Sequence, residues 1–124
     1  MVYEFNDFTF ILGNSVDLFD YFNVDELHGL HRSQCYDYAH DAYIAGLCNV
    51  YPKDHSKLFI FINRTRLGNG YKDALLIMHE AMHLSFDLHA RNKAGVQDEE
   101  QLITTAEDVA DQIITYLISE NILP

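Results

Sequence analysis

Residues 71–88 constrain this chain more than any other segment, because they contain neither proline nor glycine and are apolar on nearly every side. The apolar residues of this segment are Ala74, Leu75, Leu76, Ile77, Met78, Ala81, Met82, Leu84 and Leu88. A helix that is apolar almost all round is normally buried in the interior of a protein. The segment therefore predicts a central, buried helix.

Three polar residues, His79, Glu80 and His83, interrupt this segment in the pattern H-E-x-x-H. Four residues are slightly more than one helical turn, so both imidazoles project from one face and can bind one zinc ion. Zinc lowers the pKa of a bound water towards about 7, and Glu80 is close enough to remove the proton of that water. The pattern predicts His79 and His83 as zinc ligands and Glu80 as the catalytic base.

An accidental match to this pattern is the alternative, because a helix can hold two histidines and a glutamate without binding a metal. Such polar residues are costly on a buried helix, where an unpartnered charge destabilises the fold by on the order of several kcal/mol. A metal ion would explain why they are tolerated there, and we favour zinc binding for this reason.

A catalytic zinc site needs a third protein ligand and one open position. A helical wheel of the last predicted helix places Glu107 between Ile114 and Ile118, inside the apolar arc that is expected to face the core. Asp111 follows one turn later, where it would orient a ligand imidazole by accepting a hydrogen bond. Glu107 is therefore the favoured third ligand. The alternative is that Glu107 binds no metal and is an acidic residue at the edge of the helix interface.

His89 is a second candidate, because His79, His83 and His89 have the ligand spacing of the metzincin pattern. That pattern has glycine where this chain has Phe86, and the helix must break there to bring the last histidine to the metal. Without a break, His89 lies about 240° round the helix from His83. No methionine follows Met82 to form the methionine turn either. His89 is therefore expected to be a surface or helix-terminal histidine.

Strand patterns occupy the first half of the chain. Residues 2–12 predict one strand that ends at a Gly13-Asn14 turn, whereas residues 15–40 fit no single state. Ala42–Tyr51 and Leu58–Ile62 are β-rich runs joined by a polar connection that contains proline, so they predict a hairpin.

A second helix is predicted after residues 92–95, with acidic residues 98–100 favouring its start and apolar spacing that continues to about residue 119. Strands that come first and two long helices that come last indicate an α+β fold. The length fits one domain over residues 1–124.

Charge and composition limit the partners. The chain has 19 acidic and 8 basic residues and a formal net charge of -11, which disfavours binding to nucleic acid or to anionic membranes. No apolar run is long enough to span a membrane, and the acidic start lacks the basic region of a secretory signal. Cys35 and Cys48 lie far apart without a C-x-x-C pattern. We therefore expect a cytoplasmic, reduced protein.

His79-Glu80-x-x-His83, followed on a second helix by Glu107-x-x-x-Asp111, resembles the gluzincin zinc metallopeptidases. The short length resembles their minimal members, the minigluzincins, and the related small zincins of the ImmA/IrrE type. The resemblance is specific at these five positions, loose over residues 42–120 and absent for residues 1–41.

This resemblance implies a zincin-like fold, in which a small antiparallel or mixed sheet packs on the active-site helix beside a C-terminal helix. It also implies that one strand is the edge strand of the sheet and pairs with an extended peptide substrate through main-chain hydrogen bonds. The residues of that strand would be Leu58, Phe59, Ile60, Phe61 and Ile62.

The resulting hypothesis is a zinc-dependent hydrolase of peptides or proteins, with zinc held by His79, His83 and Glu107. A catalytically inactive zincin that binds a peptide or partner protein is the first alternative. Spacing supports no residue as the donor that would stabilise an oxyanion, although Tyr71, His89, Arg91 and Tyr116 are candidates. A metal-free interaction domain is the second alternative.

Overall fold

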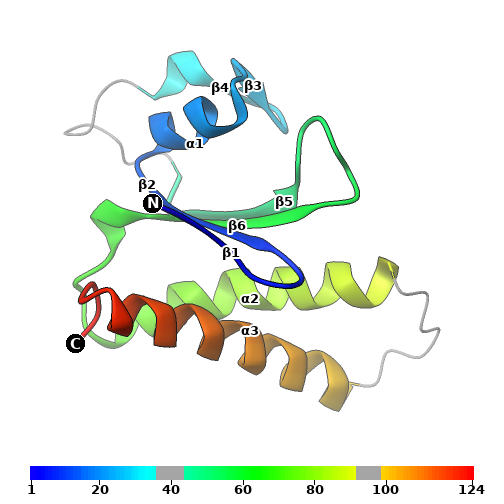
Figure 1. Ribbon diagram of the computed structural model, residues 1–124, viewed down its shortest axis with the longest axis vertical. Coiled ribbons are helices and arrows are strands. Elements are labelled where there is room, and N and C mark those ends of the chain that lie inside the picture. Colours follow the sequence, from blue (N-terminus) through cyan, green and yellow to red (C-terminus); the bar gives the residue numbers. More distant parts are fainter. Residues whose placement is uncertain (36–43, 92–98) are drawn as a thin grey trace. The chain divides into compact units, whose positions relative to one another are not determined.

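A computed structural model describes residues 1–35, 44–91 and 99–124 (Figure 1). The chain divides into two compact units, Met1–Leu67 and Gly68–Pro124, which we call the first and the second unit. The first unit contains a sheet and a short helix, and the second contains two long helices. The predicted α+β class is confirmed, and the expectation of one domain over residues 1–124 stays a prediction.

The first unit is built on a four-stranded mixed sheet with the strand order β1-β2-β6-β5. The hairpin partner of β1 (Val2–Glu4) is β2 (Thr9–Gly13), and β2 pairs in parallel with β6 (Leu58–Asn63). On its other side β6 pairs antiparallel with β5 (Gly46–Val50), which confirms the predicted hairpin between these two runs. Residues 42 and 43, the predicted start of that hairpin, lie outside the described residues.

Residues 2–12 form two strands and not the single strand that was predicted. The backbone N–H of Phe5 donates to the carbonyl of Phe8 at 2.9 Å and closes a turn between them. Asn6 and Asp7 occupy this turn, and both are favoured turn residues because their side chains bind nearby backbone groups. The flanking aromatic residues obscured that signal in the sequence.

Leu58–Ile62 do not form an edge strand, so this expectation is wrong. The strand that contains them, β6, is bonded to β2 on one side and to β5 on the other. All six of its residues are buried. A continuous apolar run of this kind is typical of a strand that is covered on both faces and lies inside a sheet. The strands at the edges of the sheet are β1 and β5.

Helix α1 (Ser15–Phe22) supplies part of the core of the first unit. The backbone N–H of Asn14 donates to the Asp17 carboxylate at 2.9 Å at the start of the helix, and Asn23 ends it in the left-handed conformation. One cluster of buried core residues in this unit comprises Ile11, Leu18, Phe19, Leu27, Cys35, Ile44, Phe59 and Phe61. Part of the unassigned stretch 15–40 is therefore a helix that packs on the sheet.

Short elements complete the first unit. Strands β3 (Glu26–Leu27) and β4 (Leu30–His31) form a small hairpin. His28 and Gly29 connect them with φ angles of 47° and 85°, as two-residue hairpin turns require. Single 3₁₀ turns follow at Arg32–Gln34 (η1) and Arg64–Arg66 (η2).

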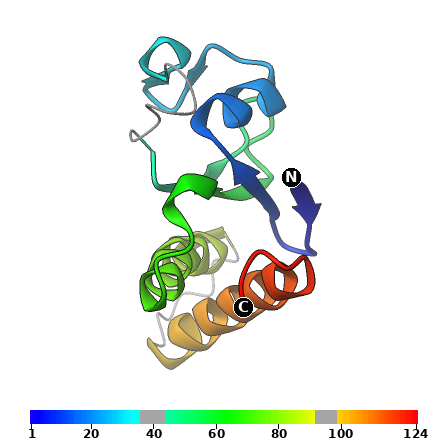
Figure 2. The same cartoon turned by 90° about the vertical axis from the view of Figure 1, so that its left-hand side faces the viewer.

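The second unit is an antiparallel pair of helices, α2 (Tyr71–Arg91) and α3 (Glu99–Ser119), which lie side by side in both views (Figures 1 and 2). Both helices were predicted. The buried apolar residues are Ile77, Ala81 and Leu84 of α2 and Leu102, Ala106, Val109, Ala110, Ile113 and Leu117 of α3. The Ser85 hydroxyl donates to the carbonyl of Leu102 at 2.7 Å and ties the start of α3 to α2.

Helix α2 is buried on one face only, so the prediction that it is buried all round is wrong. Leu75 and Phe86 are 62% and 51% exposed, whereas Ile77 and Leu84 have no exposed surface. The even distribution of apolar residues round α2 did not indicate which stripe of the helix is buried.

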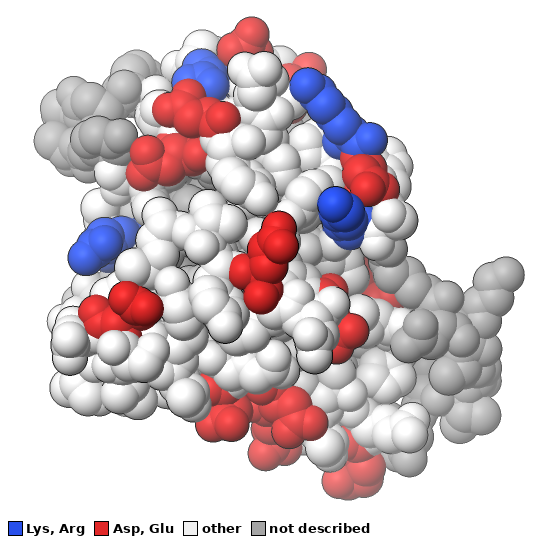
Figure 3. All heavy atoms as spheres, in the orientation of Figure 1, with Lys and Arg blue, Asp and Glu red and all other residues white. Residues whose placement is uncertain are grey.

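Helix α3 carries several exposed acidic residues. Figure 3 shows several groups of acidic side chains and few basic ones on the face in view. The exposed acidic residues of α3 are Glu99, Glu100, Glu107, Asp108 and Asp111. No helix among the residues described is both long and apolar enough to cross a membrane.

Replacing Leu84 by alanine should destabilise the protein by about 2–5 kcal/mol, because it leaves a cavity where a fully buried side chain packs. The free energy of unfolding, measured by chemical denaturation, checks this. Leu75→Ala on the same helix is the matched control, and it should change the free energy by less than about 0.5 kcal/mol because Leu75 is exposed. Equal losses in the two variants would contradict the described orientation of α2.

The hydroxyl of Tyr21 loses its proton at a higher pH than an ordinary tyrosine. Its hydrogen bond to Tyr51 at 3.5 Å raises its pKa to about 12. Tyr51→Phe should return this pKa towards the ordinary value of about 10, measured by NMR of labelled tyrosine rings. The folded state favours the neutral phenol, so the associated stability is present below about pH 10 and is lost as the pH rises towards 12. An unchanged Tyr21 pKa in Tyr51→Phe, with Tyr71→Phe as control, would refute the assigned cause.

Candidate metal centre

His79 and His83 lie on successive turns of α2, on its exposed side. Their Nε2 atoms are 3.3 Å apart, and the ring centroids are 4.9 Å apart with the planes inclined by 75°. Because residues four apart share one face of a helix, the spacing in the sequence brings the two nitrogens to one point. The sequence predicted this convergence.

The separation of the two nitrogens fits a shared metal ion. Zinc binds imidazole nitrogen at about 2.0–2.1 Å, so two nitrogens of a tetrahedral site lie about 3.3–3.4 Å apart. A direct hydrogen bond between neutral imidazoles, one donating and the other accepting, suits the observed 3.3 Å equally well. The choice between these two interpretations therefore depends on the third polar residue, Glu80.

Glu80 is buried, with 4% of its surface exposed. In the part of the chain that the structure describes, its Oε2 atom is buried and has no hydrogen-bond partner. Burial raises the pKa of the Glu80 carboxyl, and the nearby His79 and His83 act in the opposite direction. A buried acceptor without a partner destabilises a fold by about 1–3 kcal/mol, and by more when it is charged.

Ligand atoms of His79, Glu80 and His83 all lie within 4.8 Å of one another. A cation held by the imidazoles would therefore lie close to the Glu80 carboxylate. Two imidazole nitrogens with a carboxylate close by are a group that could hold a metal ion, with the carboxylate either as a ligand or beside the metal as a base.

Glu107 does not face the core, so that expectation is wrong. Its side chain is exposed on α3. Ile118 is 46% exposed, which means that the buried stripe of α3 is narrower than its apolar stripe. Glu107 lies on the exposed margin of the apolar stripe. Within the described ranges, the one group of three or more clustered metal-binding side chains omits Glu107, whose role as third ligand stays a prediction.

Asp111 is also exposed, and among the described residues it makes no hydrogen bond to His79 or His83. Its role in orienting a ligand imidazole stays a prediction. The interpretation of His89 as a helix-terminal histidine is confirmed, because α2 continues unbroken past Phe86 to Arg91. The Nδ1–H of His89 donates to the carbonyl of Ser85 one turn earlier, at 2.8 Å.

Two apolar residues on the same side of α2 as the histidines were not identified from the sequence as part of the site. Leu75 is one turn before His79, Phe86 is about one turn after His83, and both are exposed. The spacing of residues 75, 79, 83 and 86 is that of one helix face. This spacing was the available signal, but the expectation of a fully buried helix concealed it.

No model of a protein family, no curated protein and no solved structure matches this chain. The functional assignment therefore rests on the site geometry and on the chemistry of its residues.

Purified protein should contain one zinc ion per chain after reconstitution, measured by elemental analysis. His79→Ala and His83→Ala should each abolish binding, because each removes one of the converging nitrogens. His89→Ala should retain the metal, because the ring of His89 is bound to its own helix. Loss of zinc from Glu107→Ala would identify the third ligand. A native protein that takes up no zinc would rule out the metal centre.

Proposed function

We propose that this chain is a zinc-dependent peptidase that hydrolyses peptide bonds, with His79 and His83 as metal ligands and Glu80 as the catalytic base. One observation carries the proposal, namely that two imidazole Nε2 atoms converge beside a buried carboxylate oxygen with no partner in the described chain. H-E-x-x-H on a helix is the arrangement that metallopeptidases of the zincin type use.

When bound, zinc would lower the pKa of a water molecule from about 15.7 towards about 7 and polarise the carbonyl group of a peptide. Glu80 would accept the proton of the attacking water and then donate it to the leaving amine.

Glu107 is the third ligand that we propose. It lies on α3, which packs beside the motif helix within the second unit. Its exposure does not distinguish it from His79 and His83, which are exposed as well. A carboxylate from the following helix would leave one position open for water, as a catalytic zinc site requires.

A catalytically inactive module that binds a peptide or a partner protein is the second candidate. The observation that favours it is the size of the clustered group, which comprises only His79, Glu80 and His83 among the described residues. A metal held by two imidazoles alone would be weakly bound. The exposed Leu75 and Phe86 on the same helix side would then contribute to binding without turnover.

Hydrolysis of unfolded casein and of a mixed peptide library, measured by mass spectrometry, distinguishes these functions. Glu80→Gln should lower the rate by about 100-fold to 10,000-fold, because it removes the base while it keeps the shape of the side chain. Its zinc content should not change. Glu120→Gln, at the C-terminal end of the second unit, is the matched control and should leave the rate unaltered.

Three outcomes would count against this assignment. Zinc-loaded protein that binds peptides without cleaving any of them would favour the binding module. Loss of zinc from Glu80→Gln would make Glu80 a ligand and not the base. Cleavage that persists in Glu80→Gln would place catalysis elsewhere in the chain.

A further inference from the structure

An apolar stripe runs along α2 beside the two histidines of the candidate metal centre. Its residues are Leu75, Met78, Met82 and Phe86. Their spacing of three, four and four positions keeps the side chains on one side of a helix. Leu75 and Phe86 are 62% and 51% exposed, and the two methionines are half-buried. We call these four residues the α2 stripe.

The α2 stripe extends beyond the histidine pair in both directions. Because a helix rises by 1.5 Å per residue, Leu75 lies about 6 Å before His79 along the helix axis. At the other end Phe86 lies about 4.5 Å after His83, and the whole stripe is about 16 Å long. At 100° per residue, Leu75 and Phe86 point in directions that differ by about 20°. A chain that runs along α2 across the metal therefore meets apolar surface on both sides of it.

Formal charge is absent from the exposed surface of this stretch. The one charged residue between Leu75 and Phe86 is Glu80, and it is buried. This contrasts with the net charge of -11 for the chain and with the exposed acidic residues of α3. Exposed apolar side chains gain free energy when apolar groups cover them. The α2 stripe therefore favours a partner with apolar side chains.

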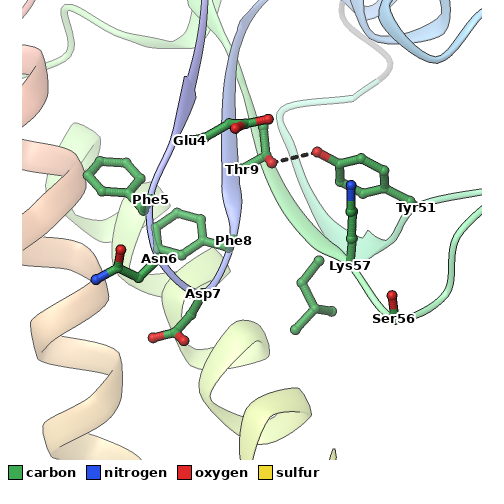
Figure 4. A pocket seen from close by; sticks show the side chains of 10 residues that line it. Glu4, Phe5, Asn6, Asp7, Phe8, Thr9, Tyr51, Ser56 and Lys57 are labelled. Atoms are coloured by element: carbon green, nitrogen blue, oxygen red, sulfur yellow. Dashed lines mark hydrogen bonds between the residues drawn. The ribbon is translucent and has the colours of Figure 1, made fainter.

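The pocket of about 230 Å³ at one end of the sheet in the first unit is a different kind of surface (Figure 4). Its apolar lining residues Phe8 and Leu58 are only 4% and 3% exposed. The hydroxyls of Thr9 and Tyr51, joined by the dashed line in Figure 4, are hydrogen-bonded to each other. Phe8 and Leu58 thus offer a ligand little surface, whereas about half or more of Leu75 and Phe86 is free to contact one.

A substrate at the metal has to present a backbone carbonyl group. Carbonyl groups inside a helix are occupied by hydrogen bonds of the helix, whereas an extended segment leaves them free. In an extended segment every second side chain points to the same side, at intervals of about 6.6 Å. Three such side chains span about 13 Å and therefore fit along a stripe of about 16 Å.

We propose that the α2 stripe selects extended substrate segments that carry large apolar side chains at alternate positions. This inference rests on the peptidase function proposed above, because it names the substrate class of the same centre. Leu75 and Phe86 contact the outer side chains, and the flexible Met78 and Met82 adapt to the one between them. The same alternation is typical of a strand that is half-buried in a folded protein. The substrates are therefore proteins that have lost their fold.

Two uncharged, fluorescently labelled peptides test this proposal, one with leucine at three alternate positions and one with serine at the same positions. Their binding to the zinc-loaded Glu80→Gln variant is measured by fluorescence anisotropy. The leucine peptide should bind at least about ten-fold more tightly, because its side chains bury apolar surface on α2. The metal-free native chain should rank the two peptides in the same order, because the α2 stripe contains no metal ligand.

Leu75→Ser and Phe86→Ser should each weaken binding of the leucine peptide by about five-fold or more. Neither variant should change the zinc content or the binding of the serine peptide, because both residues are exposed and neither is a proposed ligand. The matched control is Ile103→Ser, which alters an apolar residue of α3 that is 42% exposed. This control should bind the leucine peptide as the native chain does.

Equal binding of the two peptides would overturn the proposal, and so would binding that neither Leu75→Ser nor Phe86→Ser weakens. A leucine peptide that binds with the expected preference, but that the native zinc-loaded chain never cleaves, would refute the peptidase and keep the α2 stripe as a binding surface. Cleavage of both peptides by the native chain with equal kcat/KM would keep the peptidase and refute selection by the α2 stripe.

Discussion

The choice of inner face on α2, which packs beside α3, determines how the H-E-x-x-H motif is presented. Ile77, Ala81 and Leu84 are turned inward on α2. Because successive residues of a helix are rotated by about 100°, this choice of inner face turns His79 and His83 outward. Glu80 follows His79 by one position and is buried. The same orientation of α2 therefore leaves both imidazoles exposed and the Glu80 carboxylate buried.

Burial of the Glu80 carboxyl lowers the stability of the fold, which is a feature often found at functional sites. An acidic oxygen without a partner destabilises the fold, and local arrangements that oppose stability tend to occur at functional sites. The same burial raises the pKa of the Glu80 carboxyl, and the nearby His79 and His83 oppose this. The exposed imidazoles keep the opposite side of the motif accessible to a metal ion and to a substrate. The catalytic role of Glu80 that we propose rests on this burial and on the unpartnered oxygen.

Elements with a clear periodicity were predicted well from the sequence. Residues 71–88 and the acidic start near Glu99 gave two helices close to their actual bounds, and the apolar runs before them gave the β5–β6 hairpin. Predictions failed where a signal was short or was shared by two structures. The Asn6-Asp7 turn was hidden between aromatic residues, and the apolar run of β6 suits an edge strand less well than the interior strand that it forms.

The sequence by itself determined the convergence of His79 and His83, because a spacing of four residues on a helix brings the imidazoles together wherever that helix packs. It also determined that His89 cannot join them, since nothing at Phe86 breaks the helix. Only the tertiary structure decided that Glu107 is exposed and that β6 lies inside the sheet. Helical spacing follows from local covalent geometry, whereas burial and strand order depend on partners that are distant along the chain.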